Sequence, residues 1–327
     1  TAGGPRMGIN VDTTASLSRR QAHWEKSSSI RSRPRRVLRN VSPDEHFYPI
    51  ARQPIALHPL VKALGTAARQ RILLQSLYKF LNDIAFVETR VVSEVSLAIA
   101  NDQLPWPFPA QLRADVLTVV IDEAFHAHVA IDFMEQVQRL TGVTPLSLPT
   151  TLTVEQAIRN ALPKLPADLH IALKTISVCI AENSVTKDLI DVHREDGLNE
   201  TFHAVNGDHM IDEVRHCLIF GDVLRHLWGV LTLAQRRAIG AVLPDFLGDY
   251  LSLSLQKQFD IDILADVGLD ARQIETVIAA THLDQDLATY RTVNPIVDKV
   301  VNFLAESGVL DDPEIRKAFE DRRLVDS

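Results

Sequence analysis

The chain has 327 residues, of which 46% are hydrophobic, so it can bury a substantial core and is not a disordered protein. Its net charge of -8 disfavours nucleic acid as a partner, and charged residues interrupt its apolar runs before they reach the ~20 residues of a membrane span. No secretory signal pattern is present, and two cysteines, Cys179 and Cys217, are too few for a disulfide framework. We expect a cytoplasmic protein with no membrane and no nucleic-acid partner.

The charge is unevenly distributed along the chain. Residues 19–39 contain eight Lys or Arg and one acidic residue, whereas the rest carries 26 basic and 41 acidic residues. We interpret this Ser-rich segment as a basic arm that lies over an acidic body; a tail that binds nucleic acid or a membrane is the alternative. Residues 1–6, ahead of Met7, are interpreted as a cloning remnant. Residues 1–40 are thus remnant and arm, and residues 41–327 are expected to form a single domain.

Four long stretches have apolar residues at helical spacing. Pro105, Gly142 and Gly197 provide stop signals between them. Helices of this length are typical of a four-helix bundle. The four predicted helices cover residues 66–100, 110–140, 168–192 and 200–228.

The remaining segments predict shorter elements. Pro54 and Pro59 mark an extended stretch before the first long helix, and residues 151–165 fit a connecting helix. No run of alternating β-branched residues indicates a sheet. The expected fold is therefore all-α, a four-helix bundle with additional C-terminal helices. Within residues 232–325 we expect helix breaks near Pro244, Gly268, Pro295 and Gly308.

Two of the long helices carry the same motif, Asp-Glu-x-x-His, at residues 122–126 and 212–216. Three positions on a helix bring Glu and His onto one face, so both can reach one metal. The other two long helices each carry one Glu in an apolar surround, Glu88 and Glu182. Two single Glu and two Glu-x-x-His form the ligand scheme of di-iron and di-manganese bundles. The predicted ligands are Glu88, Glu123, His126, Glu182, Glu213 and His216.

Charge supports a metal site over mere burial. Four carboxylates in an apolar core repel one another and raise one another's pKa, whereas two divalent ions cancel their charge. Carboxylate with imidazole suits iron or manganese better than tetrahedral zinc. His209 lies on the same helix face and is available as a seventh ligand. Asp122 and Asp212 are expected to accept the ring N–H of the ligand His on the opposite helix.

The motif alone leaves the reaction open, because several di-iron classes share it. A storage ferritin is shorter, and a radical-generating reductase subunit needs a Tyr just after the first motif, where residues 127–132 contain none. Tyr78 lies about 80° off the Glu88 face. We expect His128, His203 and His226 not to be ligands, and both cysteines to be small core residues.

The sequence resembles the ferritin-like di-iron N-oxygenases typified by p-aminobenzoate N-oxygenase, over about residues 58–291. The resemblance rests on His58-Pro59-Leu60, Glu88, Asp122-Glu123-x-Phe125-His126, Ala181-Glu182 and above all His209-x-x-Asp212-Glu213-x-x-His216. It implies seven iron ligands, with His209 the one that six-ligand families lack.

The resemblance also implies a reaction. Two iron ions would activate O2 through a peroxo-di-iron(III) species and oxygenate a primary amine, free or carrier-bound, to hydroxylamine, nitroso or nitro product in secondary metabolism. An external electron donor would be needed, because the chain has no flavin or nicotinamide motif. Arg291 is a candidate for binding a substrate carboxylate. The 6% aromatic content gives no sign of an aryl-amine pocket. A homodimer is expected; the alternatives are a di-iron C–H hydroxylase or desaturase and a non-catalytic iron-binding protein.

Overall fold

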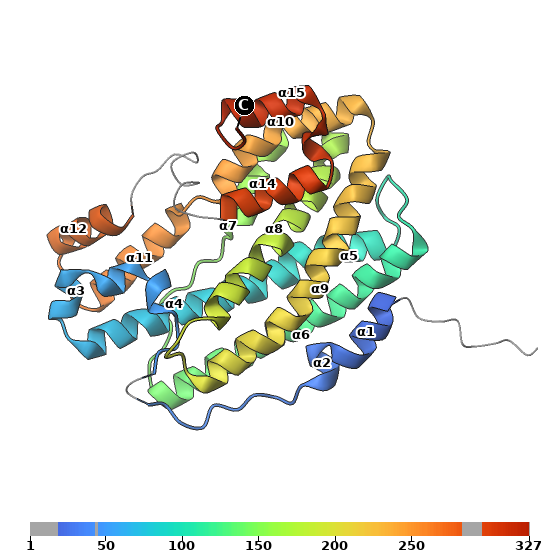
Figure 1. Cartoon of the computed structure of the whole chain (residues 1–327). Coiled ribbons are helices and arrows are strands. Elements are labelled where there is room, and N and C mark those ends of the chain that lie inside the picture. Colours follow the sequence, from blue (N-terminus) through green and yellow to red (C-terminus); the bar gives the residue numbers. More distant parts are fainter. Residues whose placement is uncertain (1–18, 43–44, 283–295, 327) are drawn as a thin grey trace, which may run out of the picture.

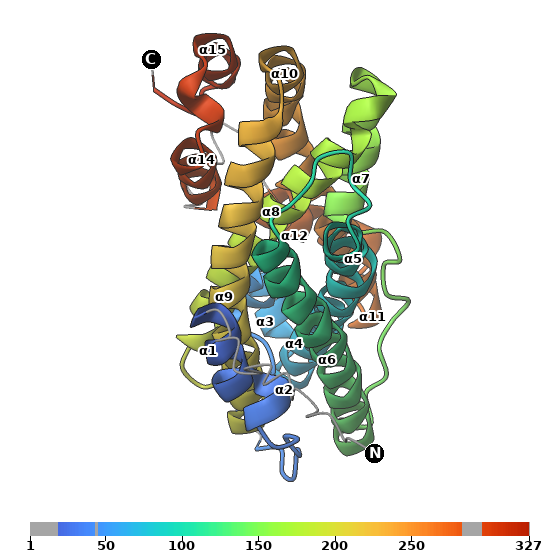
Figure 2. The same cartoon turned by 90° about the vertical axis from the view of Figure 1, so that its right-hand side faces the viewer.

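The computed structural model describes residues 19–42, 45–282 and 296–326. Four long helical segments lie side by side as a bundle (Figure 1 and Figure 2). This confirms the predicted all-α bundle, and the described residues contain no β-strand beyond a single bridge between His46 and Leu198. The segments are Thr66–Ala100 (α4, Thr66–Phe86; η3, Val87–Val92; α5, Ser93–Ala100), α6 (Ala110–Thr141), α8 (His170–His193) and α9 (Glu200–Val230).

Local signals explain where these helices begin and end. Helix α6 follows Pro109 and ends at Gly142, whose φ of 69° is a left-handed conformation that glycine adopts without steric cost. Helix α9 begins after Asn199, whose side-chain oxygen accepts hydrogen bonds from the backbone N–H groups of Thr201 and Phe202. The predicted boundaries of all four segments agree with the structure to within about two residues.

The first long segment contains an irregularity that the sequence did not reveal. Residues Val87–Val92 form a π-helical turn, and Glu88 lies at its start. Because this turn contains one extra residue, the residues after it point to a different side of the helix than they otherwise would. Such turns are frequent at functional sites. The turn separates α4, which packs against α6, from α5, which contacts both α6 and α8.

Shorter helices cover the C-terminal side of the bundle. Helix α10 packs against α7 and α15, α14 packs against α8, and α11 contacts α4 and α12. The expected breaks at Gly268 and Gly308 are present, both with positive φ, but Pro244 lies inside α10. A proline removes one helical hydrogen bond, and here the buried packing of α10 keeps the helix continuous. Pro295 lies outside the described residues. These helices are α7 (Thr153–Ala161), α10 (Leu233–Tyr250), α11 (Ser254–Asp266), α12 (Ala271–Thr281), α14 (Ile296–Glu306) and α15 (Pro313–Asp321), with 3-10 turns η4 (Leu162–Lys164), η5 (Ala167–Leu169) and η6 (Val309–Asp311).

One apolar helical stretch, Leu233–Asp266, is long enough to cross a membrane, with a mean hydropathy of 1.2 in its most apolar window. A single stretch of this kind is weak support for a membrane span, and 39% of that window is buried inside the protein.

The N-terminal arm (residues 19–42) lies along α6 and α9. It contains α1 (Arg19–Ser27) and α2 (Ser29–Ser32), and the rest of the arm forms no helix. Arg35 pairs with Asp132 of α6 at 2.6 Å, and Arg36 pairs with Asp208 of α9 at 2.7 Å. The stretch after the arm is less extended than predicted, because Pro54 and Pro59 each open a short helical turn. These turns are η1 (Ile50–Arg52), η2 (Pro54–Leu57) and α3 (Pro59–Ala63).

Buried polar residues divide the bundle interior into two apolar clusters. On one side of Glu88 and His216 lies the closed end, which includes Val92, Val119, Ile180 and Phe220 together with residues of α10 and α14. On the other side lies the cavity end, which includes Leu81, Ala130, Phe133 and Phe202. The metal ligands that we predicted from the sequence lie in the polar layer between these two clusters.

Candidate metal centre

The seven predicted ligands converge in this layer from the four long segments. All are buried, with exposures between 0 and 8%. Their donor atoms form two groups, each with atoms within 4.8 Å of one another, and Glu213 belongs to both groups. The first group is Glu88, His126, His209 and Glu213, and the second is Glu123, Glu182, Glu213 and His216.

Two carboxylates lie between the groups. Glu123 places Oε2 at 3.3 Å from Nδ1 of His126 and Oε1 at 3.2 Å from Nδ1 of His216. Glu213 Oε1 lies 3.1 Å from Nδ1 of His216 and 3.2 Å from Nε2 of His209. Glu213 therefore belongs to both groups, and Glu123 contacts one histidine of each group.

His209 lies within the cluster rather than beside it. Its Nε2 is 3.0 Å from Oε1 of Glu88, and the centre of its ring is 4.1 Å from that of His126. The structure thus brings it to the same group of atoms as the two motifs.

The two Asp residues of the motifs cross over between helices. Asp212 Oδ2 on α9 is 3.0 Å from Nε2 of His126 on α6, and Asp122 Oδ2 on α6 is 3.2 Å from Nε2 of His216 on α9. An ionised carboxylate only accepts, so each ring donates its Nε2–H outward and turns Nδ1 toward the cluster. This is the arrangement expected from the sequence, and it fixes the orientation of both rings.

Arg215 links these two aspartates, a contact that the sequence analysis missed. Its Nη1 donates to Asp212 Oδ1 at 3.1 Å, and its Nη2 donates to Asp122 Oδ2. Arg215 is 5% exposed. The signal was present in the sequence, because an Arg within a buried helix face needs a carboxylate partner, and the neighbouring motif supplies two.

The N-terminal arm completes the surroundings of the same two carboxylates. Trp24 of α1 donates its indole N–H to Asp122, at 2.9 and 3.0 Å from the two oxygens. The backbone N–H of Ser29 donates to Asp212 at 3.0 Å. Each aspartate therefore accepts from one His, from Arg215 and from the arm. No local pattern in the sequence points to these contacts, which join residues 98 and 183 positions apart.

Burial and charge shift the pKa values of the cluster strongly. Burial raises the pKa of Glu88 to about 7 and raises that of Glu182 well above its usual range. Burial opposes the charged forms of His126 and His216, but the carboxylates around them raise both pKa values well above the ordinary one. Burial would also raise the pKa of Glu213, yet the positive charge of His216 and the bonds from both imidazoles hold it well below. These shifts show that four buried carboxylates at this place need accompanying positive charge, which protons or divalent ions can supply.

These residues fit a pair of metal ions. Four carboxylates and three imidazoles are the hard and intermediate donors that iron and manganese prefer, and Glu88 Oε2 is buried with no hydrogen-bond partner among the described residues. An acceptor-only oxygen left in that state is costly unless it meets a cation.

Two of the three histidines expected not to be ligands, and Tyr78, bond to backbone carbonyls, whereas His128 lines a cavity that His126 and His209 also line. His203 Nε2 bonds to the His193 carbonyl, His226 Nε2 bonds to the Pro107 carbonyl, and the hydroxyl of the buried Tyr78 donates to the Val143 carbonyl. Both cysteines are free; Cys179 is buried, whereas Cys217 is only partly buried. Arg291 lies outside the described residues.

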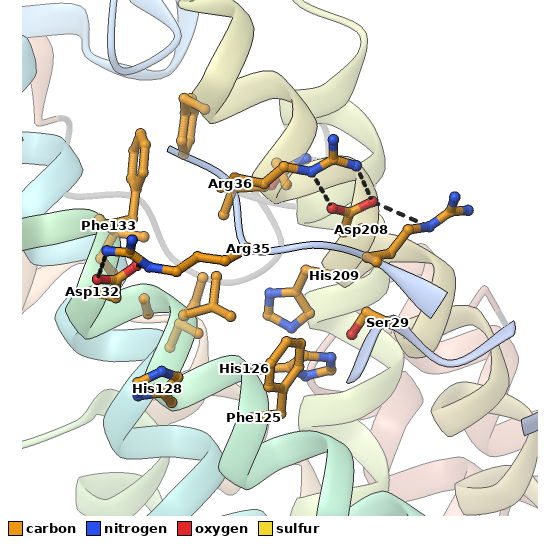
Figure 3. Close-up of a pocket in the computed structure, with 18 of the residues that line it drawn as sticks. Ser29, Arg35, Arg36, Phe125, His126, His128, Asp132, Phe133, Asp208 and His209 are labelled. Atoms are coloured by element: carbon orange, nitrogen blue, oxygen red, sulfur yellow. Dashed lines mark hydrogen bonds and ion pairs between the residues drawn. The ribbon is translucent and has the colours of Figure 1, made fainter. Parts of the chain in front are cut away.

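A cavity of about 150 Å³ adjoins the cluster on the cavity end (Figure 3). His126 and His209 line its inner side, and Arg35 and Arg36 of the arm lie on its outer side. The overall aromatic content gave no sign of an aromatic pocket, because composition averages over the whole chain. In the structure, four Phe side chains from three helices line this cavity. They are Phe80, Phe125, Phe133 and Phe202.

Comparison with known proteins gives a consistent result. A family model described as p-aminobenzoate N-oxygenase AurF matches residues 32–308. The 4-aminobenzoate N-oxygenase of Streptomyces thioluteus is 22% identical over 198 residues, which cover 60% of this chain and 59% of that protein. The matched range of this chain includes all seven residues of the candidate metal centre. The chain belongs to the p-aminobenzoate N-oxygenase AurF family.

Proposed function

We propose that the protein is a di-iron N-oxygenase that uses O2 to oxygenate a primary amine. The observation that carries the proposal is the position of the seven-residue cluster, buried between four helices and open on one side to a Phe-lined cavity. Family membership and the 4-aminobenzoate N-oxygenase relative support it.

We assign the seven clustered residues as the iron ligands. Glu88, His126 and His209 would hold one iron, Glu123, Glu182 and His216 would hold the other, and Glu213, which belongs to both groups, would contribute to both sites. Bound iron would supply the redox chemistry that activates O2. The protein holds Nδ1 of His126 and His216 toward the metals through Asp212 and Asp122 and supplies a dry surround.

The cavity would bind the amine with its nitrogen toward His126 and His209. Four Phe side chains give it an apolar wall suited to a flat ring, which favours an aryl amine over a small polar one. Arg35 and Arg36 at the outer side are paired with Asp132 and Asp208. An external reductant would return the irons to the ferrous state after each turnover, and we place the reaction in secondary metabolism.

Anaerobic loading with two ferrous ions, followed by addition of 18O-labelled O2 and 4-aminobenzoate, tests the proposal. We expect labelled hydroxylamine, nitroso or nitro product by mass spectrometry. A panel of aliphatic primary amines measures the preference for aryl substrates. Iron oxidation that is unaffected by every amine, with no oxygenated product, would refute N-oxygenation and favour iron binding without catalysis. Oxygen or a double bond appearing on carbon would instead identify a hydroxylase or desaturase.

A further inference from the structure

The N-terminal arm supplies one wall of the cavity beside the polar layer. Residues 29–30 and 33–36 of the arm line the cavity together with side chains of α4, α6 and α9. Figure 3 shows the arm, with Arg35 and Arg36, running past the His126 and His209 rings. The position of the arm therefore decides how widely this side of the cavity is open.

The arm is attached to the body mainly by polar contacts. Of the hydrophobic side chains in residues 19–42, two are buried, Trp24 and Leu38. The arginines at the cavity are partly exposed, and ion pairs of this kind contribute about 0–1 kcal/mol each. Segments with few buried apolar contacts open more readily than the rest of a fold. The arm therefore has the attachment that a lid requires.

The backbone of Ser29 connects the arm to the candidate metal centre through Asp212. Its N–H donates to Asp212 Oδ2 at 3.0 Å, and the same oxygen accepts from Nε2 of His126 at 3.0 Å. Ser29 is 2% exposed and Asp212 is 0% exposed, so water competes little for this bond. His126 belongs to the first group of donor atoms. One carboxylate oxygen thus joins the arm to that group.

The side chain of Trp24 makes the equivalent contact with the second group. Its indole nitrogen donates to Asp122 Oδ2 at 3.0 Å, and this oxygen lies 3.2 Å from Nε2 of His216. His216 belongs to the second group of donor atoms. The arm therefore has one buried hydrogen bond for each of the two candidate metal positions.

We propose that the arm is a lid that closes the cavity most firmly when both metal positions are filled. The inference rests on the proposed function and extends it to the control of substrate access. A metal ion on Nδ1 holds each imidazole with its Nε2–H directed at the aspartate, so the carboxylate stays where the arm can donate to it. By linkage, a metal that favours the closed arm binds more tightly, by the same factor, when the arm is closed. Residues 19–31 precede the residues matched by the family model, so the lid is a property of this chain's own arm.

Ser29→Pro tests the coupling without changing any side chain of the candidate metal centre. Proline has no backbone N–H, so the bond to Asp212 is lost. Ser29 is the first residue of α2, where proline is favoured, and Ser28 before it has φ -58° and ψ 144°, an extended conformation that a following proline allows. Ser29→Ala is the matched control, because it loses the hydroxyl and keeps the N–H.

Hydrogen exchange measured by mass spectrometry reports the opening of the arm directly. The protein is stripped with a chelator and then loaded with two equivalents of Mn²⁺, which suits these donors. We expect loading to slow exchange of residues 19–36 by roughly 5- to 150-fold in the wild type and in Ser29→Ala. Ser29→Pro should retain a smaller response through Trp24, and Ser29→Pro combined with Trp24→Phe should show none. Exchange in α6 and α9 should slow in every variant that binds the metal.

Two further measurements test the consequences of a lid. Calorimetry should show weaker Mn²⁺ binding in Ser29→Pro, by the factor by which its exchange response is reduced. In stopped-flow mixing, 4-aminobenzoate should associate faster with Mn²⁺-loaded Ser29→Pro than with loaded Ser29→Ala, because the arm opens more often.

The outcomes separate the inference from the proposed function. If Mn²⁺ slows exchange in α6 and α9 of the wild type but leaves residues 19–36 unchanged, the arm is not coupled to the metal and only the inference fails. The same holds if the double variant responds as the wild type does. If the arm responds to metal but the iron-loaded wild type oxygenates no amine, the proposed function fails, and the arm is left as a cover that responds to metal without controlling a reaction.

Discussion

The two ends of the bundle interior differ in how they are filled and covered. At the closed end, side chains of α5, α8 and α9 pack with those of α10 and α14 into one apolar cluster. At the cavity end, a space remains between α4, α6 and α9, and the N-terminal arm lies over it. The polar layer lies between the two. The difference teaches that one end holds the buried polar layer in place by packing, whereas the other leaves a cavity beside it, the place where we propose that the substrate binds.

Loss of Glu213 should have the largest effect, because this carboxylate belongs to both groups of the layer. Glu213→Gln should lower the bound metal from two ions to one or fewer and reduce activity more than the roughly 10- to 100-fold typical of an outer hydrogen-bond partner. Elemental analysis after loading checks this. Glu200→Gln, at an exposed position on the same helix, should bind metal normally. Full occupancy in Glu213→Gln would show that the layer is not the metal site.

Because the closed end is filled and the cavity end is not, replacing a Phe by Ala should lower the free energy of unfolding more at the closed end than at the cavity end. Phe220 is 0% exposed in the closed end, so Phe220→Ala should lower the free energy of unfolding by about 3–5 kcal/mol. Phe125 is only partly buried and lines the cavity, so Phe125→Ala should cost less and mainly weaken binding of 4-aminobenzoate. Urea denaturation and binding measurements on both variants check this. Equal losses of stability would remove the distinction between the ends.

Trp24 tests whether the arm supports the polar layer as well as covering the cavity. Trp24→Phe keeps most of the ring and removes the N–H that Asp122 accepts. By the usual effect of losing an outer partner, metal affinity should fall by about 10- to 100-fold, with the helical content unchanged. Titration with Co²⁺, followed by its visible absorption, measures this. His23→Ala, at an exposed position of α1, is the control and should bind as the wild type does.

The pKa shifts within the polar layer predict how metal affinity depends on pH. Their surroundings raise the pKa values of His126, His216 and Glu182 well above their ordinary ranges, so each holds its proton more firmly than in water, and ligation must displace that proton. Affinity should therefore rise with pH by roughly tenfold per unit for each proton released, and be lost progressively as pH falls. Calorimetry in buffers of different ionisation enthalpy counts these protons. Affinity independent of pH between 6 and 8 would contradict these raised pKa values.

Sequence patterns were sufficient to predict the helices and the residues that cluster in the polar layer, and insufficient to predict what surrounds that layer. Helical spacing and the repeated Asp-Glu-x-x-His are local, so they placed Glu123 and His216, and even the crossed pairing with Asp122, without a structure. The π-helical turn at Glu88 depends on tertiary packing and has no local signature. Trp24 and Ser29 reach the layer through contacts across more than ninety residues, which no single-sequence pattern encodes.

The ion pairs that hold the arm over the cavity end should contribute least. Arg36 pairs with Asp208 near the surface, so Arg36→Gln should lower the free energy of unfolding by less than about 1 kcal/mol, and the loss should shrink in 1 M salt, where screening acts within about 3 Å. Hydrogen exchange of residues 19–36 measures whether the arm opens more often in the variant. Arg39→Gln, at an exposed position near the end of the arm, should leave exchange unchanged. If Arg36→Gln does the same while Trp24→Phe increases exchange, the bonds to the buried aspartates hold the arm, and its basic residues serve mainly to line the cavity.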